Sequence, residues 1–207
     1  GRKYDLYTNV CKEYISHGYN YQESFEKAYA PIFKYKAGGV EISKIICMEY
    51  GKNTVVVYYK IKTGTAKAKL TLAPVVNFRD FHTMNTDHNF DLKQEIKDNK
   101  VKMIIDNNAQ TPIYMHLSEG KYIEHNNDIF KNMFYIEEEK REFYPEENHS
   151  VPGVYEVEIP ARQEKEISFI CSLENNIEEI DSKKVISSEI ERLEKLFNNS
   201  LLIDIRN

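Results

Sequence analysis

The strongest constraint on the fold is a two-residue alternation of apolar and polar side chains along residues 40–72. In its first run, one parity holds Val40, Ile42, Ile46, Met48 and Tyr50, and the other holds Glu41, Ser43 and Glu49. The pattern resumes after Gly51 with Val55, Val57, Tyr59 and Ile61, and after Gly64 with Ala66, Ala68, Leu70 and Leu72. Because strand side chains point alternately to two faces, this pattern predicts a three-stranded antiparallel meander with one face in water.

Five further segments have the composition of strands, and short turn-like stretches separate them. The expected strands are 101–105, 112–117, 133–136, 155–159 and 167–171, and the expected turns are 106–108, 118–120, 125–128 and 152–153. Residues 182–199 instead carry Ile186, Ile190, Leu193 and Phe197 at helical spacing, which predicts an amphipathic C-terminal helix. Many strands and one terminal helix predict a mainly β protein, a large antiparallel β-sandwich with a C-terminal connector helix.

Composition and charge exclude several classes of protein. The chain has 207 residues, with 28 Lys and Arg against 33 Asp and Glu, and this acidic balance disfavours a nucleic-acid-binding face. No apolar run approaches the roughly 20 residues of a membrane span, and no secretory leader pattern opens the sequence. Cys11, Cys47 and Cys171 lie far apart, which favours reduced thiols over a disulfide scaffold. We therefore expect a cytoplasmic protein with no nucleic-acid or membrane partner.

The candidate site is a polar and aromatic stretch at the end of the third expected strand. Its six residues are Asn77, Phe78, Arg79, Asp80, Phe81 and His82. In a strand, Asn77, Arg79 and Phe81 would point to one face and the other three residues to the opposite face. Arg and carboxylate groups suit sugar hydroxyls, and Phe rings can stack on the apolar face of a sugar. The structural alternative is that Arg79 and Asp80 pair with neighbouring polar groups and anchor the connection that follows.

No catalytic or metal-binding motif accompanies this stretch. The sequence lacks GxSxG, HExxH, a phosphate-binding Gly loop and a dinucleotide fingerprint. Asp80, His82, Asp87 and His88 are close in sequence, but their spacing matches no known metal pattern, so we expect neither metal nor cofactor. No Asp or Glu lies in an apolar context that would tune its pKa for acid–base catalysis, so we predict no catalytic residue. The charge-dense stretch 137–147 is interpreted as the solvated end of a hairpin.

Several segments carry a resemblance to a known family. The most specific is LTLAPVVNFRDFH at 70–82, and the others are 18–19, 24–25, 31–35, 40–48, 53–59, 139–142 and 152–155. Over residues 15–175, these segments resemble the N-terminal domain of bacterial and archaeal-type glycogen debranching enzymes, the amylo-α-1,6-glucosidases. The chain departs from the family pattern at its start, which lacks a Gly-rich segment and an Arg-Arg-Tyr-His stretch, and at Glu142, where a Gly is expected.

The resemblance implies a supersandwich domain of the kind that precedes the helical toroid of glucoamylase-like enzymes. The catalytic carboxylates would belong to that toroid. Residues 1–181 are then expected to form a non-catalytic β-sandwich domain that is truncated at its N-terminus, and 182–207 a helical linker toward the catalytic domain. With its 80–90 loop, the domain would shape the mouth where an α-glucan, glycogen or limit dextrin, enters for hydrolysis of α-1,6 branch linkages.

Two other functions remain open from the sequence. A free-standing α-glucan-binding module would use Phe78, Phe81 and surface Tyr side chains as stacking platforms, although the absence of Trp disfavours it. A structural or protein-interaction β-sandwich would make no sugar contact. If native strands are missing at the start, the unpaired sheet edge is expected to promote dimerisation of this chain.

Overall fold

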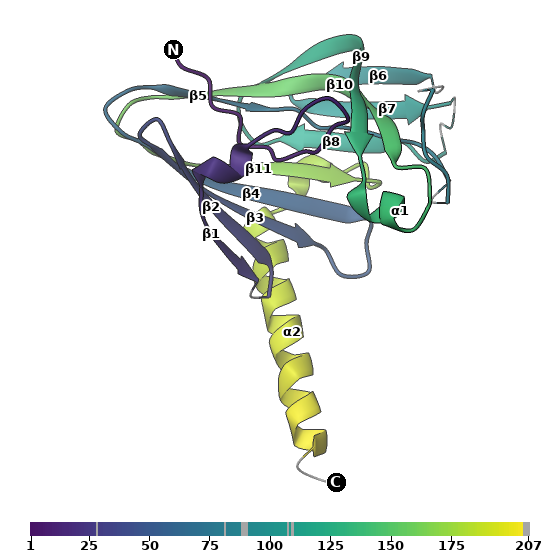
Figure 1. Ribbon diagram of the computed structural model, residues 1–207. Coiled ribbons are helices and arrows are strands. Elements are labelled where there is room, and N and C mark those ends of the chain that lie inside the picture. The colour runs from purple at the N-terminus through teal and green to yellow at the C-terminus, as the bar shows by residue number, and fades with distance from the viewer. Residues whose placement is uncertain (28, 81, 88–90, 107, 109, 205–207) are drawn as a thin grey trace.

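The computed structural model describes the chain except residues 28, 81, 88–90, 107, 109 and 205–207, and except the side chains of 127 and 201–204. The described chain forms two antiparallel sheets that pack face to face, followed by a long C-terminal helix (Figure 1). The prediction of a mainly β, antiparallel sandwich with a C-terminal helix is therefore confirmed.

Among the described residues, the larger sheet has eight strands and the smaller sheet has three. In spatial order the larger sheet holds β1 (Gln22–Lys27), β2 (Pro31–Ala37), β3 (Val40–Met48), β4 (Thr54–Thr63), β11 (Glu164–Ser172), β8 (Ile113–Leu117), β7 (Lys100–Ile105) and β6 (Leu92–Lys97). The smaller holds β5 (Ala68–Leu72), β10 (Glu146–Ile159) and β9 (Lys121–Phe134). The helical segments are η1 (Gly18–Tyr21), α1 (Ile136–Lys140), η2 (Ile177–Glu179) and α2 (Ser182–Asp204).

The predicted meander is correct for its first two strands and wrong for its third. β3 and β4 pair antiparallel, with Ile42 opposite Ile61. β5 leaves the large sheet and pairs with β10, with Leu70 opposite Val157. Leu70 thereby faces the same core from the opposite sheet. Alternation determines which side chains of β5 face the core. It is satisfied equally by the predicted pairing with β4 and by the observed pairing with β10.

The main core lies between the two sheets. The large sheet contributes Ile61, Val101, Met103, Met115, Leu117 and Ile167, and the small sheet contributes Tyr155, Val157 and Ile159. Burial of such a side chain stabilises the fold by about 1.5–3 kcal/mol relative to its exposure. β1 and β2 contribute no buried residue, because the core is centred on the strands farther along the large sheet.

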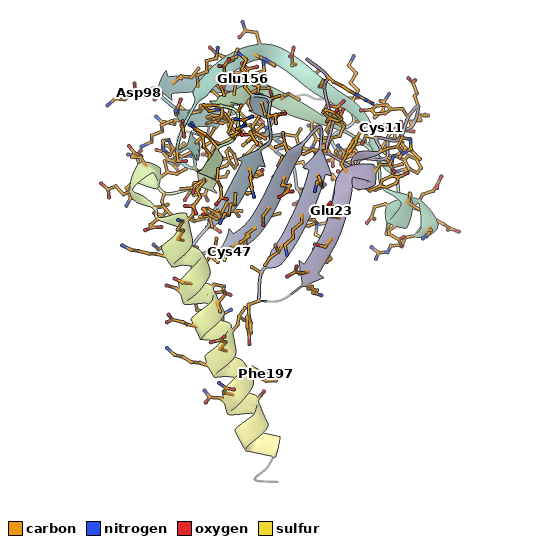
Figure 2. All side chains as sticks on the ribbon, turned by 90° about the vertical axis from the view of Figure 1, so that its left-hand side faces the viewer. Cys11, Glu23, Cys47, Asp98, Glu156 and Phe197 are labelled. Atoms are coloured by element: carbon orange, nitrogen blue, oxygen red, sulfur yellow. The ribbon has the colours of Figure 1, made fainter. Side chains whose placement is uncertain are left out.

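The outer face of the large sheet is not wholly in water, contrary to the prediction. Cys47, Val56, Tyr114 and Ile170 on this face pack with Ile177 of η2 to form a second core, which Ile180, Val185 and Ile186 extend. Met48 and Tyr50, predicted to point inward, are 55% and 73% exposed. Figure 2 shows Cys47 beside the start of α2, whereas Phe197 lies far along the helix, beyond the sandwich.

Two predicted turns lie inside long strands. The 125–128 stretch belongs to β9 and the 152–153 stretch to β10. Both coincide with a shift in register, since Val151 pairs with Asp128 whereas Gly153 pairs with Glu124. The turn-forming residues thus mark a β-bulge instead of a chain reversal. β1, β2 and β6 were not predicted, and residue 136, predicted as strand, begins α1.

Strands β1 and β6 form the edges of the large sheet. Each carries charged side chains, namely Glu23, Glu26 and Lys27 on β1 and Lys93, Glu95 and Lys97 on β6. Charges at an edge oppose pairing with another chain. Dimerisation through an open edge therefore stays a prediction.

Helix α2 begins at Ser182 because Asp181 caps its first turn. Asp181 Oδ1 accepts hydrogen bonds from the backbone N–H groups of Lys183 at 3.0 Å and Lys184 at 3.3 Å. The helix contacts the sandwich through β3 and β4 and then extends away from it (Figure 1). Neither α2 nor any other helix in the described part of the chain has the length and apolar character needed to cross a membrane.

Asp181→Ala is expected to lower the free energy of unfolding by about 1 kcal/mol, because the first turn of α2 loses its side-chain acceptor. Urea denaturation followed by circular dichroism measures the change. Glu191→Ala, at an exposed position of the same helix, is the control and is expected to change stability by less than about 0.5 kcal/mol. Equal effects of the two substitutions would contradict the capping role.

Candidate functional site

The described site residues, Asn77, Phe78, Arg79, Asp80 and His82, lie in a loop and not in a strand. β5 ends at Leu72, and the connection that follows meets β10 through an isolated bridge between Val76 and Ser150. The alternating strand geometry expected for residues 77–82 is therefore wrong. Phe81 lies outside the described residues.

Glu147 of β10 anchors this loop. Its carboxylate forms an ion pair with Arg79, in which Nε donates to Oε1 and Nη2 donates to Oε2 at 3.2 Å. It also accepts hydrogen bonds from the backbone N–H of Asn85 at 3.0 Å and from the Tyr135 hydroxyl at 2.9 Å. The side chain of Glu147 is 1% exposed and that of Arg79 is 26% exposed. Glu147 was not predicted as a site residue, because its charge-dense stretch, 137–147, is typical of the solvated end of a hairpin.

The protonation of this cluster follows from its contacts. Burial raises the pKa of Glu147, but the hydrogen bonds from Arg79, Asn85 and Tyr135 and the charge of Arg79 outweigh it, so the pKa lies below its ordinary value. The hydrogen bond to Glu147 raises the pKa of Arg79. Burial, together with the bond to Glu147, raises the pKa of Tyr135. At neutral pH the carboxylate is ionised and fully engaged, so it is poorly suited to donate a proton.

Side-chain amides extend the attachment of the loop to β10. Asn77 Nδ2 donates to the Asn148 carbonyl at 3.4 Å, and Asn85 Nδ2 donates to Asn77 Oδ1 at 3.0 Å. The backbone N–H of Asn148 donates to the Asn85 carbonyl at 2.9 Å. The nearly buried His149 places Nε2 3.1 Å from the Tyr135 hydroxyl. These contacts agree with the structural interpretation of Arg79 and extend it to Asn77.

Phe78, Asp80 and His82 instead face the solvent. Phe78 is 43% exposed, and the side chains of Asp80 and His82 are 65% and 72% exposed. Asp80 accepts hydrogen bonds from the backbone N–H and from Nδ1 of His82, both at 2.9 Å, and these bonds lower the pKa of Asp80. The loop therefore combines an anchored side, made by Asn77 and Arg79, with an exposed aromatic and polar side.

Metal ligation finds no support in the described part of the chain. Within it, no group of three or more His, Cys, Asp or Glu side chains could hold a metal ion. His88, one of the four residues considered for a metal site, lies outside the described residues. The three cysteines are free thiols.

Comparisons with known proteins identify the family. A family model described as "Glycogen debranching enzyme N terminal" matches residues 1–166. No curated protein matches the chain. Among solved structures, "Putative kojibiose phosphorylase from human microbiome" is 9% identical at a TM-score of 0.40, over 91% of this chain and 24% of that one. A bacterial glucoamylase complexed with acarbose is 15% identical at a TM-score of 0.41, over 90% of this chain and 30% of that one.

The present chain thus spans less than a third of the length of either solved structure. The family match covers residues 1–166, most of the chain, and includes the small sheet, the anchored loop and every strand of the large sheet except most of β11. This chain belongs to the glycogen debranching enzyme N-terminal domain family.

Proposed function

We propose that this chain is the non-catalytic N-terminal domain of a cytoplasmic enzyme that hydrolyses α-1,6 branch linkages in glycogen or limit dextrin. The family match over residues 1–166 carries the proposal. In this proposal residues 1–181 form the domain that packs on a helical catalytic domain, and 182–207 form the linker toward it. A helix that leaves the sandwich after its first turns suits a linker, and three free cysteines suit the cytoplasm.

The described part of the 73–87 loop is the proposed contact with the α-glucan. The ion pair between Arg79 and Glu147 fixes the loop on β10, so little conformational entropy is lost when the exposed side meets a ligand. The ring of Phe78 offers a stacking face, and the Asp80–His82 pair offers partners for sugar hydroxyls. In the assembled enzyme this side of the loop would form part of the mouth through which a branched chain enters.

In an enzyme that contains this domain, Phe78→Ala is expected to raise KM for limit dextrin about fivefold to tenfold and to leave kcat unchanged. The reason is the loss of one stacked ring, worth about 1 kcal/mol. Steady-state kinetics measure both constants. Phe25→Ala is the matched control, because Phe25 is 48% exposed but lies on edge strand β1, and its KM is expected to stay unchanged.

The outcome separates the competing functions. Release of glucose from limit dextrin by this chain alone would overturn its non-catalytic assignment. Equal KM values for the two Phe variants would remove the loop from the path of the substrate. Saturable binding of maltooligosaccharides by the chain, without any effect of the chain on hydrolysis, would favour the free-standing α-glucan-binding module.

A further inference from the structure

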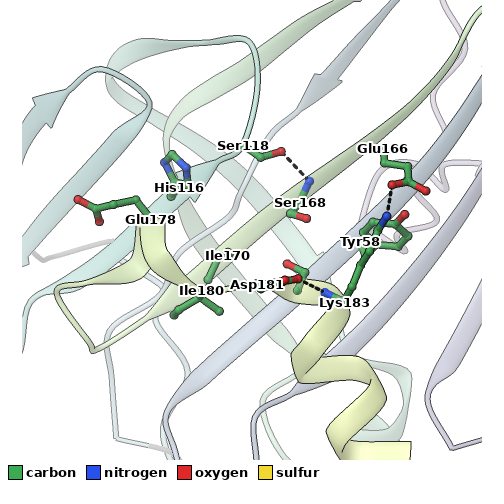
Figure 3. A pocket seen from close by; sticks show the side chains of 11 residues that line it. Tyr58, His116, Ser118, Glu166, Ser168, Ile170, Glu178, Ile180, Asp181 and Lys183 are labelled. Atoms are coloured by element: carbon green, nitrogen blue, oxygen red, sulfur yellow. Dashed lines mark hydrogen bonds and ion pairs between the residues drawn. The ribbon is translucent and has the colours of Figure 1, made fainter.

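A second candidate site lies on the outer face of the large sheet, where α2 begins (Figure 3). It is a pocket of about 210 Å³ between strands β4, β8 and β11 and residues 178–183. The small sheet and the 73–87 loop lie on the other face of the large sheet, so this pocket is separate from the proposed glucan contact.

Two buried polar atoms in the wall of this pocket have no hydrogen-bond partner among the described residues. They are Oγ of Ser182 and Nδ1 of His116. Ser182 is only 3% exposed. Such atoms are uncommon in folded proteins, because a buried polar group without a partner loses its hydration and gains nothing in return. Burial lowers the pKa of His116, which keeps the imidazole neutral and able to accept or donate at Nδ1.

The charged side chains around the pocket already have partners. Glu166 pairs with Lys183, Glu178 pairs with Lys100 at 2.8 Å, and Asp181 caps α2. Among the described residues that line the pocket, no lysine or arginine is therefore unpaired and available to bind an anion. The paired carboxylates keep lone pairs that can accept from ligand hydroxyls.

The rest of the lining combines hydroxyls with an apolar floor. Tyr58 of β4, Ser168 of β11 and Ser118, which directly follows β8, bring hydroxyl groups, and Ile170 and Ile180 form the apolar part. Convergent polar groups over an apolar surface are typical of small-molecule sites. The volume lies below the roughly 300–1,000 Å³ of sites for drug-sized ligands, so it suits one small ring and not an extended chain.

We propose that this pocket binds a neutral polyhydroxy ligand the size of a single hexose, with Ser182 Oγ and His116 Nδ1 as its innermost hydrogen-bond partners. Both atoms lie behind the pocket surface in the free protein. A rotation of the Ser182 hydroxyl between staggered positions turns it toward the ligand. A hexose supplies many hydroxyls and an apolar ring face, which match the two kinds of lining. The proposal does not depend on the proposed debranching function.

Titration of the intact chain with D-glucose, followed by NMR chemical shifts, tests this site. We expect saturable shifts confined to the pocket residues. Ser182→Ala is expected to weaken binding about tenfold, equivalent to ~1.4 kcal/mol, while the fold is kept because Oγ has no partner to lose. Ser188→Ala, at an exposed position of the same helix, is the matched control and is expected to bind as the unchanged chain does.

Glucose 6-phosphate supplies a probe of similar shape that carries negative charge, and it is expected to bind more weakly than glucose. Tighter binding of the phosphate, an unchanged affinity in Ser182→Ala, or a glucose-soaked crystal with water only in the pocket would each overturn the proposal. Phe78→Ala is expected to leave this titration unchanged, which separates a failure here from a failure of the glucan contact.

Discussion

Glu147→Ala is expected to lower the free energy of unfolding by about 3 kcal/mol, because it removes the buried carboxylate that pairs with the guanidinium of Arg79. The Asn85 N–H and the Tyr135 hydroxyl lose their acceptor at the same time. Arg79 is 26% exposed, so water partly solvates the freed charge and keeps the loss near the lower end of the range for buried pairs. Urea denaturation measures the change.

Glu158→Ala is the matched control for this substitution. Glu158 lies on the same strand but is exposed, so its removal is expected to change stability by less than about 0.5 kcal/mol. A loss for Glu147→Ala no larger than the control would show that the ion pair does not anchor the loop.

The stabilisation by Glu147 is also expected to depend on pH. Its pKa in the folded state lies below the ordinary value of 4.5. A lowered folded pKa means that the contribution is fully present above the unfolded pKa and is lost as the pH falls through the folded one. The stability difference between the unchanged chain and Glu147→Gln is therefore expected to be constant near neutral pH and to shrink below about pH 4.5. A difference that persists into strong acid would contradict this assignment.

Gly153→Ala is expected to lower the free energy of unfolding by about 3 kcal/mol, because the added methyl group has no space. A Cβ atom at this position would lie 2.4 Å from the carbonyl oxygen of Ile123 and 2.5 Å from the ring of Tyr122. Both residues belong to β9, whose backbone is held by its ladder with β10. Thermal and urea unfolding measure the effect.

Gly51→Ala separates lack of space from backbone strain. At Gly51 an added methyl group meets nothing within 4 Å, and only the positive φ of 77° is unfavourable, so the expected loss is about 1 kcal/mol. If the two substitutions cost the same, the close approach of β9 and β10 at the bulge is not what requires a glycine at 153.

Residues 40–72 show how far periodicity determines this fold. β3 and β4 could be predicted because each presents apolar side chains at alternate positions and a short turn joins them. The partner of β5 could not be predicted, since alternation sets the face of a side chain and leaves open which sheet holds the strand. The covered outer face was missed for a related reason. Val56 and Cys47 lie on the parity that the neighbouring Lys, Glu and Thr side chains assign to water.

The candidate loop shows what a local stretch of sequence leaves undetermined. Its polar and aromatic composition identified residues 77–82 as a candidate site. Which of these side chains are anchored and which are exposed depends on Glu147, which is 68 positions from Arg79 in the sequence. Composition assigned Glu147 to the solvent, because it ends a charge-dense stretch. One pattern could have identified it, since Glu147 and His149 share the buried parity of Tyr155, Val157 and Ile159 on β10.

The unequal widths of the two sheets divide the molecule into regions that resist opening to different degrees. β4 and β11 contribute side chains to both cores, one on each face. These two strands therefore separate from each other only when the whole domain unfolds. β1 and β2 have no buried side chain of their own and are held by their ladders and by contacts such as that between Phe25 and Phe33. β1 and β2 can therefore separate from β3 by local unfolding that leaves both cores intact. The free energy of opening is then lower for these outer strands than for the centre of the domain.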